Sequence, residues 1–313
     1  MTRYARRFRR IARELSSAEL RAVPMDSLSD PRELTRWRSG EPRFLDYYGD
    51  AGIRLALDRY GIAREAEKRG FHGLHIETRC DEERHTLLVS ATPDDGGPRA
   101  RLAEAVVRRD RLLPKPVEGL PPLDASYDVL TVDWLVLRDP RRRFSRERPH
   151  LPGQDAPGLG MGEQIFELLC RAVERLRLDG MVSTADHFHN AVLYLSLMPF
   201  LDPRHAGEVH ALMQLLMVSE RLNLAQASWA VHWGFVRDAR QEAPYRWHGE
   251  VQVWPRATSL ERYLGSDAYF RCLAEVASQC RFTLDRKGFD RRWELERDAL
   301  EGRLAPPIST RPR

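Results

Sequence analysis

Cysteine, lysine and long apolar runs are all scarce in this sequence. The four cysteines (Cys80, Cys170, Cys272 and Cys280) are scattered and form no C-x-x-C pair. No apolar run reaches the length of about eighteen residues that a membrane-spanning helix needs. The basic residues 1–10 are followed by no apolar signal core. We therefore expect a cytoplasmic protein with reduced thiols, neither secreted nor inserted in a membrane.

The charge balance does not favour a nucleic-acid-binding protein. The 313 residues carry 50 Lys and Arg against 46 Asp and Glu, a net charge of +4. Lysine is present only at Lys68, Lys115 and Lys287, so arginine supplies nearly all the positive charge. Nucleic-acid binding requires a concentrated basic patch. We interpret the arginines mainly as solvated side chains, and we expect no nucleic-acid partner.

The sequence is rich enough in apolar residues, 42%, to form one large domain or two ordinary ones. Helical spacing of apolar residues predicts helices over residues 3–23 and 50–60, and a further helix over 62–69 closed by Gly70. A Ser-Asp-Pro helix start predicts another helix near residues 30–37. The segment 1–70 is therefore expected to be a helical extension.

The pattern changes to strands at Phe71. Alternating or continuous apolar residues predict strands over residues 73–78, 85–90, 102–108 and 127–137. The last of these is nearly apolar on both faces, which is typical of a central strand. A glycine turn, a helix to about Leu178, a strand over 180–184 and a second helix to Leu197 follow.

Residues 203–313 are expected to form a mostly helical C-terminal region. Helices are predicted over residues 208–224 and 260–280. The aromatic segment 228–236 and residues 252–254 are interpreted as strands.

The glycine turn is the clearest pointer to a ligand. Gly158, Gly160 and Gly162 stand on alternate positions, with Leu159 and Met161 between them, directly before a predicted helix. Main-chain N–H groups that are left uncovered at a helix start bind anions such as a diphosphate. The turn has neither the Walker pattern nor G-x-G-x-x-G. The alternative is a tight, close-packed connection between strand and helix.

The order of paired strands, long central strand, glycine turn, helix, strand and second helix resembles the GNAT acyltransferase superfamily over about residues 71–202. In that family, amides of a glycine-rich loop hold the diphosphate of coenzyme A. The resemblance implies an α+β fold with a mixed, mostly antiparallel sheet flanked by helices, and acetyl-CoA or another acyl-CoA as cosubstrate. The chain departs from the family in the long loop 139–157 before the glycines.

The resemblance also implies roles for individual residues. Main-chain groups of Leu135 and Leu137 would pair with the pantetheine amides. Asn190 corresponds in part to an asparagine of the family's next helix, although it lies four positions before Tyr194 where the family's asparagine lies about seven before. Tyr194 would protonate the departing thiolate. The acyl acceptor would be an amine, of a small molecule or a peptide.

Three side chains are candidates for the base that takes the amine's proton. His187 and His189 lie at a strand-to-helix junction, and histidine accepts protons near neutral pH. Asp133 is the only acid in its apolar strand and must find a partner or be neutral. The alternatives are capping or packing histidines, a structural salt bridge at Asp133 and a hydrogen-bonded core tyrosine at Tyr194.

The sequence therefore predicts an acyl-CoA-dependent N-acyltransferase-like protein that transfers the acyl group directly to an amine. One alternative is a GNAT-shaped binding or scaffold protein without turnover. Another is a metal-dependent hydrolase built on Asp186, His187 and His189, although no convincing third metal ligand is visible there. We expect no metal for the acyl transfer itself.

Overall fold

The computed structural model describes residues 2–22, 43–239 and 243–303. The chain folds as two compact units, each assembled from separate segments. Unit 1 consists of Met1–Arg111, Asp128–Pro140 and Gly158–Met181, and unit 2 of Leu112–Tyr127, Arg141–Pro157 and Val182–Arg313. The helix predicted near residues 30–37 lies outside the described residues.

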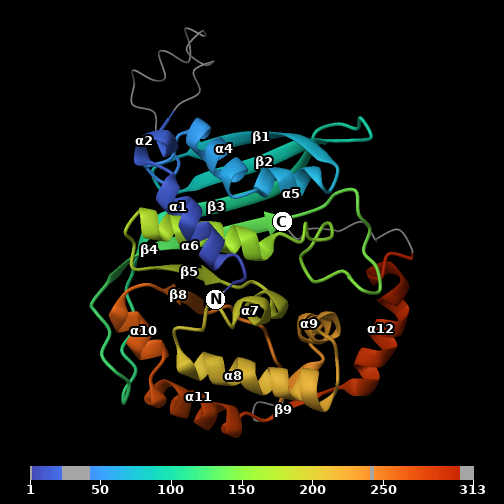
Figure 1. Cartoon of the computed structure of the whole chain (residues 1–313). Coiled ribbons are helices and arrows are strands. Elements are labelled where there is room, and N and C mark those ends of the chain that lie inside the picture. Colours follow the sequence, from blue (N-terminus) through green and yellow to red (C-terminus); the bar gives the residue numbers. More distant parts are fainter. Residues whose placement is uncertain (1, 23–42, 240–242, 304–313) are drawn as a thin grey trace. The chain divides into compact units, whose positions relative to one another are not determined.

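Unit 1 combines helices with the first strands of the larger sheet. Its helices are α1 (Ala5–Glu14), α2 (Ser17–Leu20), α4 (Asp50–Arg59), α5 (Ile62–Glu67) and α6 (Gly162–Arg175). Its strands are β1 (Phe71–Cys80), β2 (His85–Pro93), β3 (Ala100–Leu112) and β4 (Tyr127–Leu137). Figure 1 shows α1, α4, α5 and α6 lying against these strands. Apolar side chains of the helices and strands face one another there, and they form the core of this unit.

The sheet is mostly antiparallel, as the sequence predicts. Its strand order is β1-β2-β3-β4-β5-β8, where β5 is Gly180–Thr184 and β8 is Val251–Pro255. The β1–β2 and β2–β3 pairs are both antiparallel, with His85 of β2 opposite Cys80 on one side and Val107 on the other. The α+β class with a sheet flanked by helices is therefore confirmed.

The predicted helix over residues 3–23 is interrupted by a local capping signal. The hydroxyl of Ser16 accepts a hydrogen bond from the N–H of Glu19 (3.2 Å), while the Glu19 carboxylate accepts from the N–H of Ser16 (2.8 Å). This reciprocal arrangement starts a new helix and so ends the preceding one. Two helices, α1 and α2, therefore replace the single predicted one.

Unit 2 is mostly helical. Its helical segments are α7 (Phe188–Tyr194), α8 (Pro203–Met213), the π-helical η2 (Gln214–Ser219), α9 (Leu224–His232), α10 (Thr258–Leu264), α11 (Asp267–Gln279) and α12 (Arg286–Leu300). A small sheet has the order β7-β6-β9, formed by Ala243–Pro244, Val236–Asp238 and Phe282–Leu284.

The strand predicted over residues 228–236 is wrong, because most of this segment belongs to α9. Asn223 caps this helix, since its side chain accepts from the N–H of Gln226 (2.9 Å), and Gln226 returns a bond to the N–H of Asn223 (3.0 Å). Trp229 and Trp233, one turn apart, then pack together with ring centroids 4.9 Å apart. Aromatic content favours strands only as a weak preference, and a capping box followed by helical packing outweighs it.

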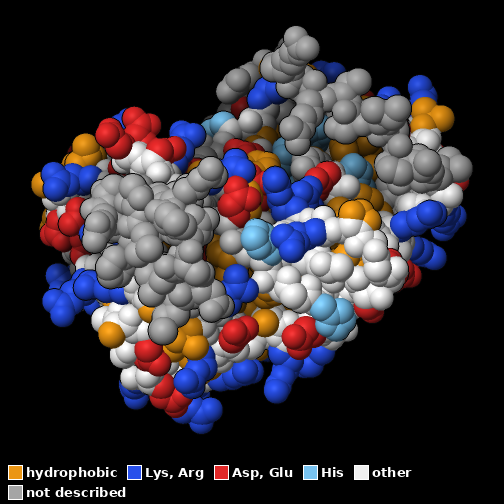
Figure 2. All heavy atoms as spheres, turned by 90° about the horizontal axis from the view of Figure 1, so that it is seen from above, with side chains coloured by type: hydrophobic (Ala, Val, Ile, Leu, Met, Phe, Trp, Pro, Cys, Tyr) orange, Lys and Arg blue, Asp and Glu red, His pale blue; other side chains and the backbone are white. Residues whose placement is uncertain are grey.

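The exposed surface carries interspersed charges of both signs. Figure 2 shows Lys and Arg side chains among Asp and Glu side chains on the face that it presents. Exposed ion pairs of this kind include Arg79–Glu77 (2.7 Å) and Arg101–Glu104 (3.0 Å). Among the helices that the structure describes, none has the length and apolar character to cross a bilayer.

Candidate functional site

The glycine turn of unit 1 presents its backbone outward and its apolar side chains inward. Gly158 and Gly160 are exposed, whereas Leu159 and Met161 are only 7% and 2% exposed. Gly160 has a φ of +72°, a conformation that favours glycine. The two apolar side chains therefore anchor the turn in the core and leave the glycine backbone uncovered.

The space around the three glycines is open. A Cβ atom at Gly158 would lie 3.8 Å from its nearest neighbour, the carbonyl oxygen of Leu137, and one at Gly160 would lie 3.9 Å from the guanidinium of Arg69. At Gly162, no atom of the described residues lies within 4 Å of that position. Close packing therefore does not explain these glycines, and the alternative of a tight, crowded connection loses its support.

The start of helix α6 has the features of an anion site. Among the described residues, no side chain caps its first N–H groups, which carry the positive end of the helix dipole. Glu163 in the first turn would repel an anion, but its carboxylate accepts from the N–H of Arg3 (2.8 Å) and pairs with the Arg3 guanidinium (2.9 Å). Arg3 therefore partly neutralises this carboxylate.

Arg69 adds a cation beside the glycine turn that sequence patterns do not reveal. Its Nε donates to the carbonyl oxygen of Leu159 (2.9 Å), and its Nη1 pairs with Glu65 (2.9 Å). Arg69 precedes the turn by about ninety residues in sequence, so only the folded chain brings them together. The hydrogen bond holds the turn and the positive charge in one place.

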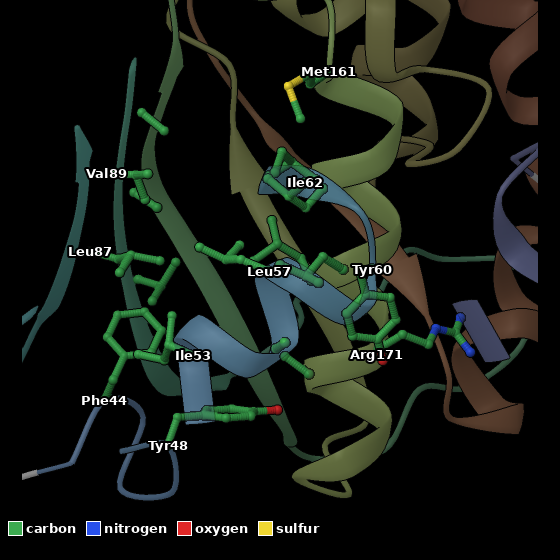
Figure 3. A pocket seen from close by; sticks show the side chains of 18 of the residues that line it. Phe44, Tyr48, Ile53, Leu57, Tyr60, Ile62, Leu87, Val89, Met161 and Arg171 are labelled. Atoms are coloured by element: carbon green, nitrogen blue, oxygen red, sulfur yellow. The ribbon is translucent and has the colours of Figure 1, made fainter. Parts of the chain in front are cut away.

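An apolar cavity of about 140 Å³ lies directly inside the turn. Leu159 and Met161 line it together with Leu135 and Leu137 of β4. Helices α1, α4, α5 and α6 and strands β1, β2 and β3 supply much of the remaining wall. Figure 3 shows Leu57, Ile62 and Val89 converging on this space. The four apolar residues among the predicted coenzyme-binding residues of unit 1 therefore share one cavity wall. The carbonyl of Leu137 accepts from the N–H of Leu159 (3.4 Å).

The tyrosines at the cavity are held in the protonated form. Burial raises the pKa of Tyr60 to about 12, and burial likewise raises the pKa of Tyr48. Figure 3 shows both rings beside the apolar side chains of α4. The cavity wall is therefore uncharged at these positions, which suits an apolar guest.

The carboxylate of Asp133 forms ion pairs with arginine side chains. It pairs with Arg108 (3.2 Å) and Arg84 (3.8 Å) from the neighbouring elements of unit 1. Its side chain is 25% exposed. This geometry is that of a structural ion pair, which is the alternative considered for this residue.

The predicted histidines gather in unit 2 with a third one. The rings of His187 and His189 stack with centroids 5.5 Å apart, and His232 lies 5.8 Å from His187. Burial lowers the pKa of all three, and His232 further lowers that of His187. His232 is the last residue of α9, in a segment whose aromatic content predicts a strand, so no sequence pattern places it beside the other two.

His189 is the most strongly perturbed of the three. It is 2% exposed, and its Nδ1 lies 2.8 Å from the hydroxyl oxygen of Ser228. Burial, and then the charges of His187 and His232, lower its pKa to about 4. His189 is therefore neutral throughout the physiological range.

Stability of the chain should consequently fall in mild acid. The unfolded pKa of 6.5 exceeds the folded value of about 4, so the unfolded state binds the proton first. The His189 contribution is complete above pH 6.5 and is lost as pH falls towards 4. We expect a loss of about 2 kcal/mol by pH 5. Urea unfolding at pH 8 and pH 5 should show a smaller difference in His189→Gln than in the wild type, and an unchanged difference would contradict this assignment.

The remaining predicted residues lie on or next to α7. Asn190 donates its main-chain N–H to the carbonyl of His187 (3.0 Å), and both Leu197 and Met198 donate to the carbonyl of Tyr194 (2.9 and 2.8 Å). Burial raises the pKa of the Tyr194 phenol. Tyr194 is therefore protonated at neutral pH, as a proton donor must be.

The metal site suggested by Asp186, His187 and His189 is not among the ligand groups that the described residues form. Asp186 is exposed, while His189 turns towards Ser228. The group that the described residues do form consists of His205, Glu208 and His248.

Comparison with family models and with curated proteins gives no relative on which to base a function. No protein-family model matches this chain, and no curated protein matches it. A functional proposal therefore rests on the residues and their geometry.

Proposed function

We propose that this chain is an acyl-CoA-dependent N-acyltransferase-like protein of the GNAT type. The observation that supports the proposal most strongly is the open space around Gly158, Gly160 and Gly162 at the start of α6, where the N-cap residue makes no side-chain capping hydrogen bond. Main-chain N–H groups and the helix dipole would hold the diphosphate of coenzyme A. The order of β4, glycine turn, α6 and β5 agrees with the order of elements on which the resemblance rests.

Two neighbouring features suit the same guest. The guanidinium of Arg69, hydrogen-bonded to the turn at Leu159, would add a positive charge near the phosphates. Leu135 and Leu137 of β4 line the apolar cavity inside the turn, and pantetheine would extend along this strand. A diphosphate beside an apolar wall is the combination of chemistry that acyl-coenzyme A presents.

The chemistry would be direct transfer. The acceptor amine attacks the thioester carbonyl, the amine nitrogen loses a proton and the C–S bond breaks to release the thiolate. His187 is neutral and half-buried and could accept the proton, whereas His189 is buried with a pKa of about 4 and is the weaker base. Tyr194 has a raised pKa and so retains its proton to give to the thiolate. Asp133 is less suited, because Arg108 and Arg84 already pair with it.

Coenzyme binding is tested by thermal unfolding with coenzyme A and acetyl-CoA. A ligand at a hundred times its dissociation constant stabilises by about 2.7 kcal/mol, which raises Tm by roughly 5–10 °C. We expect this shift in the wild type and none in Gly160→Glu, because a carboxylate at the turn repels the diphosphate. Gly162→Glu should also abolish the shift. Because Gly162 does not have a positive φ, this variant adds the charge without backbone strain.

Gly96→Glu is the matched control for Gly160→Glu. Gly96 has a φ of +75°, is exposed and has no described atom within 4 Å of an added Cβ. Both variants therefore carry the same backbone strain and the same added charge. If the wild type shifts and Gly160→Glu shifts equally, the turn is not the coenzyme site.

Turnover separates the acyltransferase from a binding protein of the same shape. Release of free thiol from acetyl-CoA, measured against a panel of small amines and peptides, should depend on the amine. His187→Gln and Tyr194→Phe should lower the rate while leaving the thermal shift unchanged. Binding without thiol release would favour the scaffold alternative.

A further inference from the structure

A second cluster of unit 2 brings two histidines and a carboxylate to one point. His205 and Glu208 lie one turn apart on α8, and His248 comes from the segment before β8. The Glu208 Oε2 is 3.6 Å from Nδ1 of His205 and 3.8 Å from Nε2 of His248. One donor atom from each of the three side chains lies within 4.8 Å of the others.

The buried histidine of this cluster has no hydrogen bond to satisfy it. His205 is 5% exposed, and neither of its ring nitrogens has a partner within hydrogen-bond distance among the described residues. The same holds for Oε2 of Glu208. A buried polar group without a partner destabilises the fold. A cation between these atoms would satisfy the carboxylate and one nitrogen of His205 together.

The surrounding structure holds the His205 ring and the main chain on either side of His248 in place. Phe200 packs edge-on against the His205 ring at 4.6 Å. Trp247 donates its indole N–H to the carbonyl of Ala185 (2.9 Å), which holds the residue next to His248. Gly249 packs so closely that a Cβ there would lie 2.6 Å from the carbonyl oxygen of Ala185. His248 is therefore fixed on both sides in sequence.

Donor type and spacing agree with a small divalent transition-metal ion. Two imidazoles and one carboxylate are a ligand set of zinc sites that keep a fourth position for water. Zinc–ligand bonds of about 2.1 Å in a tetrahedron place donor atoms roughly 3.4 Å apart. The two measured separations to Glu208 are close to this value, and the His248 side chain is 55% exposed and so free to adjust.

We propose that His205, Glu208 and His248 form a binding site for one Zn²⁺ ion or a similar divalent transition metal. The site is independent of the proposed coenzyme-binding turn, since it rests on other residues and other chemistry. With three protein ligands, water would complete the coordination. The competing arrangement is a metal-free cluster of two histidines around one carboxylate.

The test uses the full chain after dialysis against a chelator. We expect Co²⁺ to bind once per chain with the intense visible absorption of a tetrahedral site, and Zn²⁺ to displace it. His248→Gln, at an exposed position, should fold normally and weaken Zn²⁺ binding at least about 100-fold, since removal of outer-shell partners alone weakens metal sites by roughly 10–100-fold. Glu208→Gln retains the shape and should weaken binding similarly.

Two controls separate this site from other histidines. His210→Gln removes an exposed histidine of the same helix, and His187→Gln removes one of the other cluster. Both should bind Zn²⁺ like the wild type. Absence of stoichiometric binding by the wild type, or full binding by both His248→Gln and Glu208→Gln, would overturn the proposal. So would loss of binding in His187→Gln instead.

Discussion

Arg171→Met is expected to lower the free energy of unfolding of unit 1 by about 3–5 kcal/mol, because it leaves a buried carboxylate without its cation. The side chains of Arg171 and Glu167 on α6 are each 4% exposed, and Nη2 of Arg171 lies 2.8 Å from Oε1 of Glu167. Arg171 also pairs with Glu174 at 2.5 Å. The Glu167 carboxylate also accepts a hydrogen bond from the hydroxyl of Thr2 (2.6 Å). We expect this bond to remain in the variant.

A second substitution and an exposed control identify the cause. Removing both charges with Arg171→Met and Glu167→Leu should restore much of the lost stability, since the unpaired buried charge is then gone. Arg286→Met removes another arginine with two acidic partners, Asp290 (2.9 Å) and Glu220 (3.1 Å). That arginine is 46% exposed, so its loss should change the free energy by less than about 1 kcal/mol.

Urea unfolding and hydrogen exchange of the α6 amides provide the measurement. Exchange should accelerate in α6 of Arg171→Met and return towards the wild-type rate in the double variant. Equal losses for Arg171→Met and Arg286→Met would show that burial of the pair does not matter. Figure 3 places Arg171 at the cavity wall, so the same variant also tests how firmly α6 holds the core side of the glycine turn.

Local sequence patterns predict the elements of unit 1 well. The strand predicted over residues 127–137 is observed with those bounds as β4, and the helix predicted over 50–60 is α4, Asp50–Arg59. A nearly continuous apolar run and a helical spacing are both properties of neighbouring residues. Capping is local as well, since the Ser16–Glu19 capping box lies inside the predicted helix and divides it into α1 and α2.

Some features of the candidate sites are visible in the local sequence, and others depend on contacts between distant segments. Alternating glycines before a helix indicate an exposed backbone from sequence alone, and the open space at Gly158, Gly160 and Gly162 agrees with that interpretation. Arg69 at the turn and His248 beside Glu208 depend on contacts between distant segments. No spacing within one helix or strand contains that information. Asp133 shows the converse, because the sequence indicated a need for a partner without identifying Arg108.

Gly52→Ala is expected to destabilise the chain by about 3 kcal/mol or more, although alanine normally stabilises a helix by about 1 kcal/mol relative to glycine. Gly52 lies in α4, where it is buried, and a Cβ there would lie 2.0 Å from the carbonyl oxygen of Leu20 and 2.6 Å from its Cα. These are main-chain atoms at the end of α2. The same carbonyl accepts from the N–H of Gly49 (3.1 Å), so neither helix can move away without breaking this hydrogen bond.

Gly162→Ala is the control, because it adds the same methyl group to a helical glycine that has free space around it. Gly162 is also a helical glycine, but among the described residues no atom lies within 4 Å of its added Cβ. Its replacement should therefore be neutral or stabilise by up to about 1 kcal/mol, through helix propensity and a less flexible unfolded chain. Urea unfolding should show a loss of stability for Gly52→Ala and no loss for Gly162→Ala. If Gly52→Ala were more stable than the wild type, α2 and α4 would have to lie far enough apart to leave space for the added methyl group.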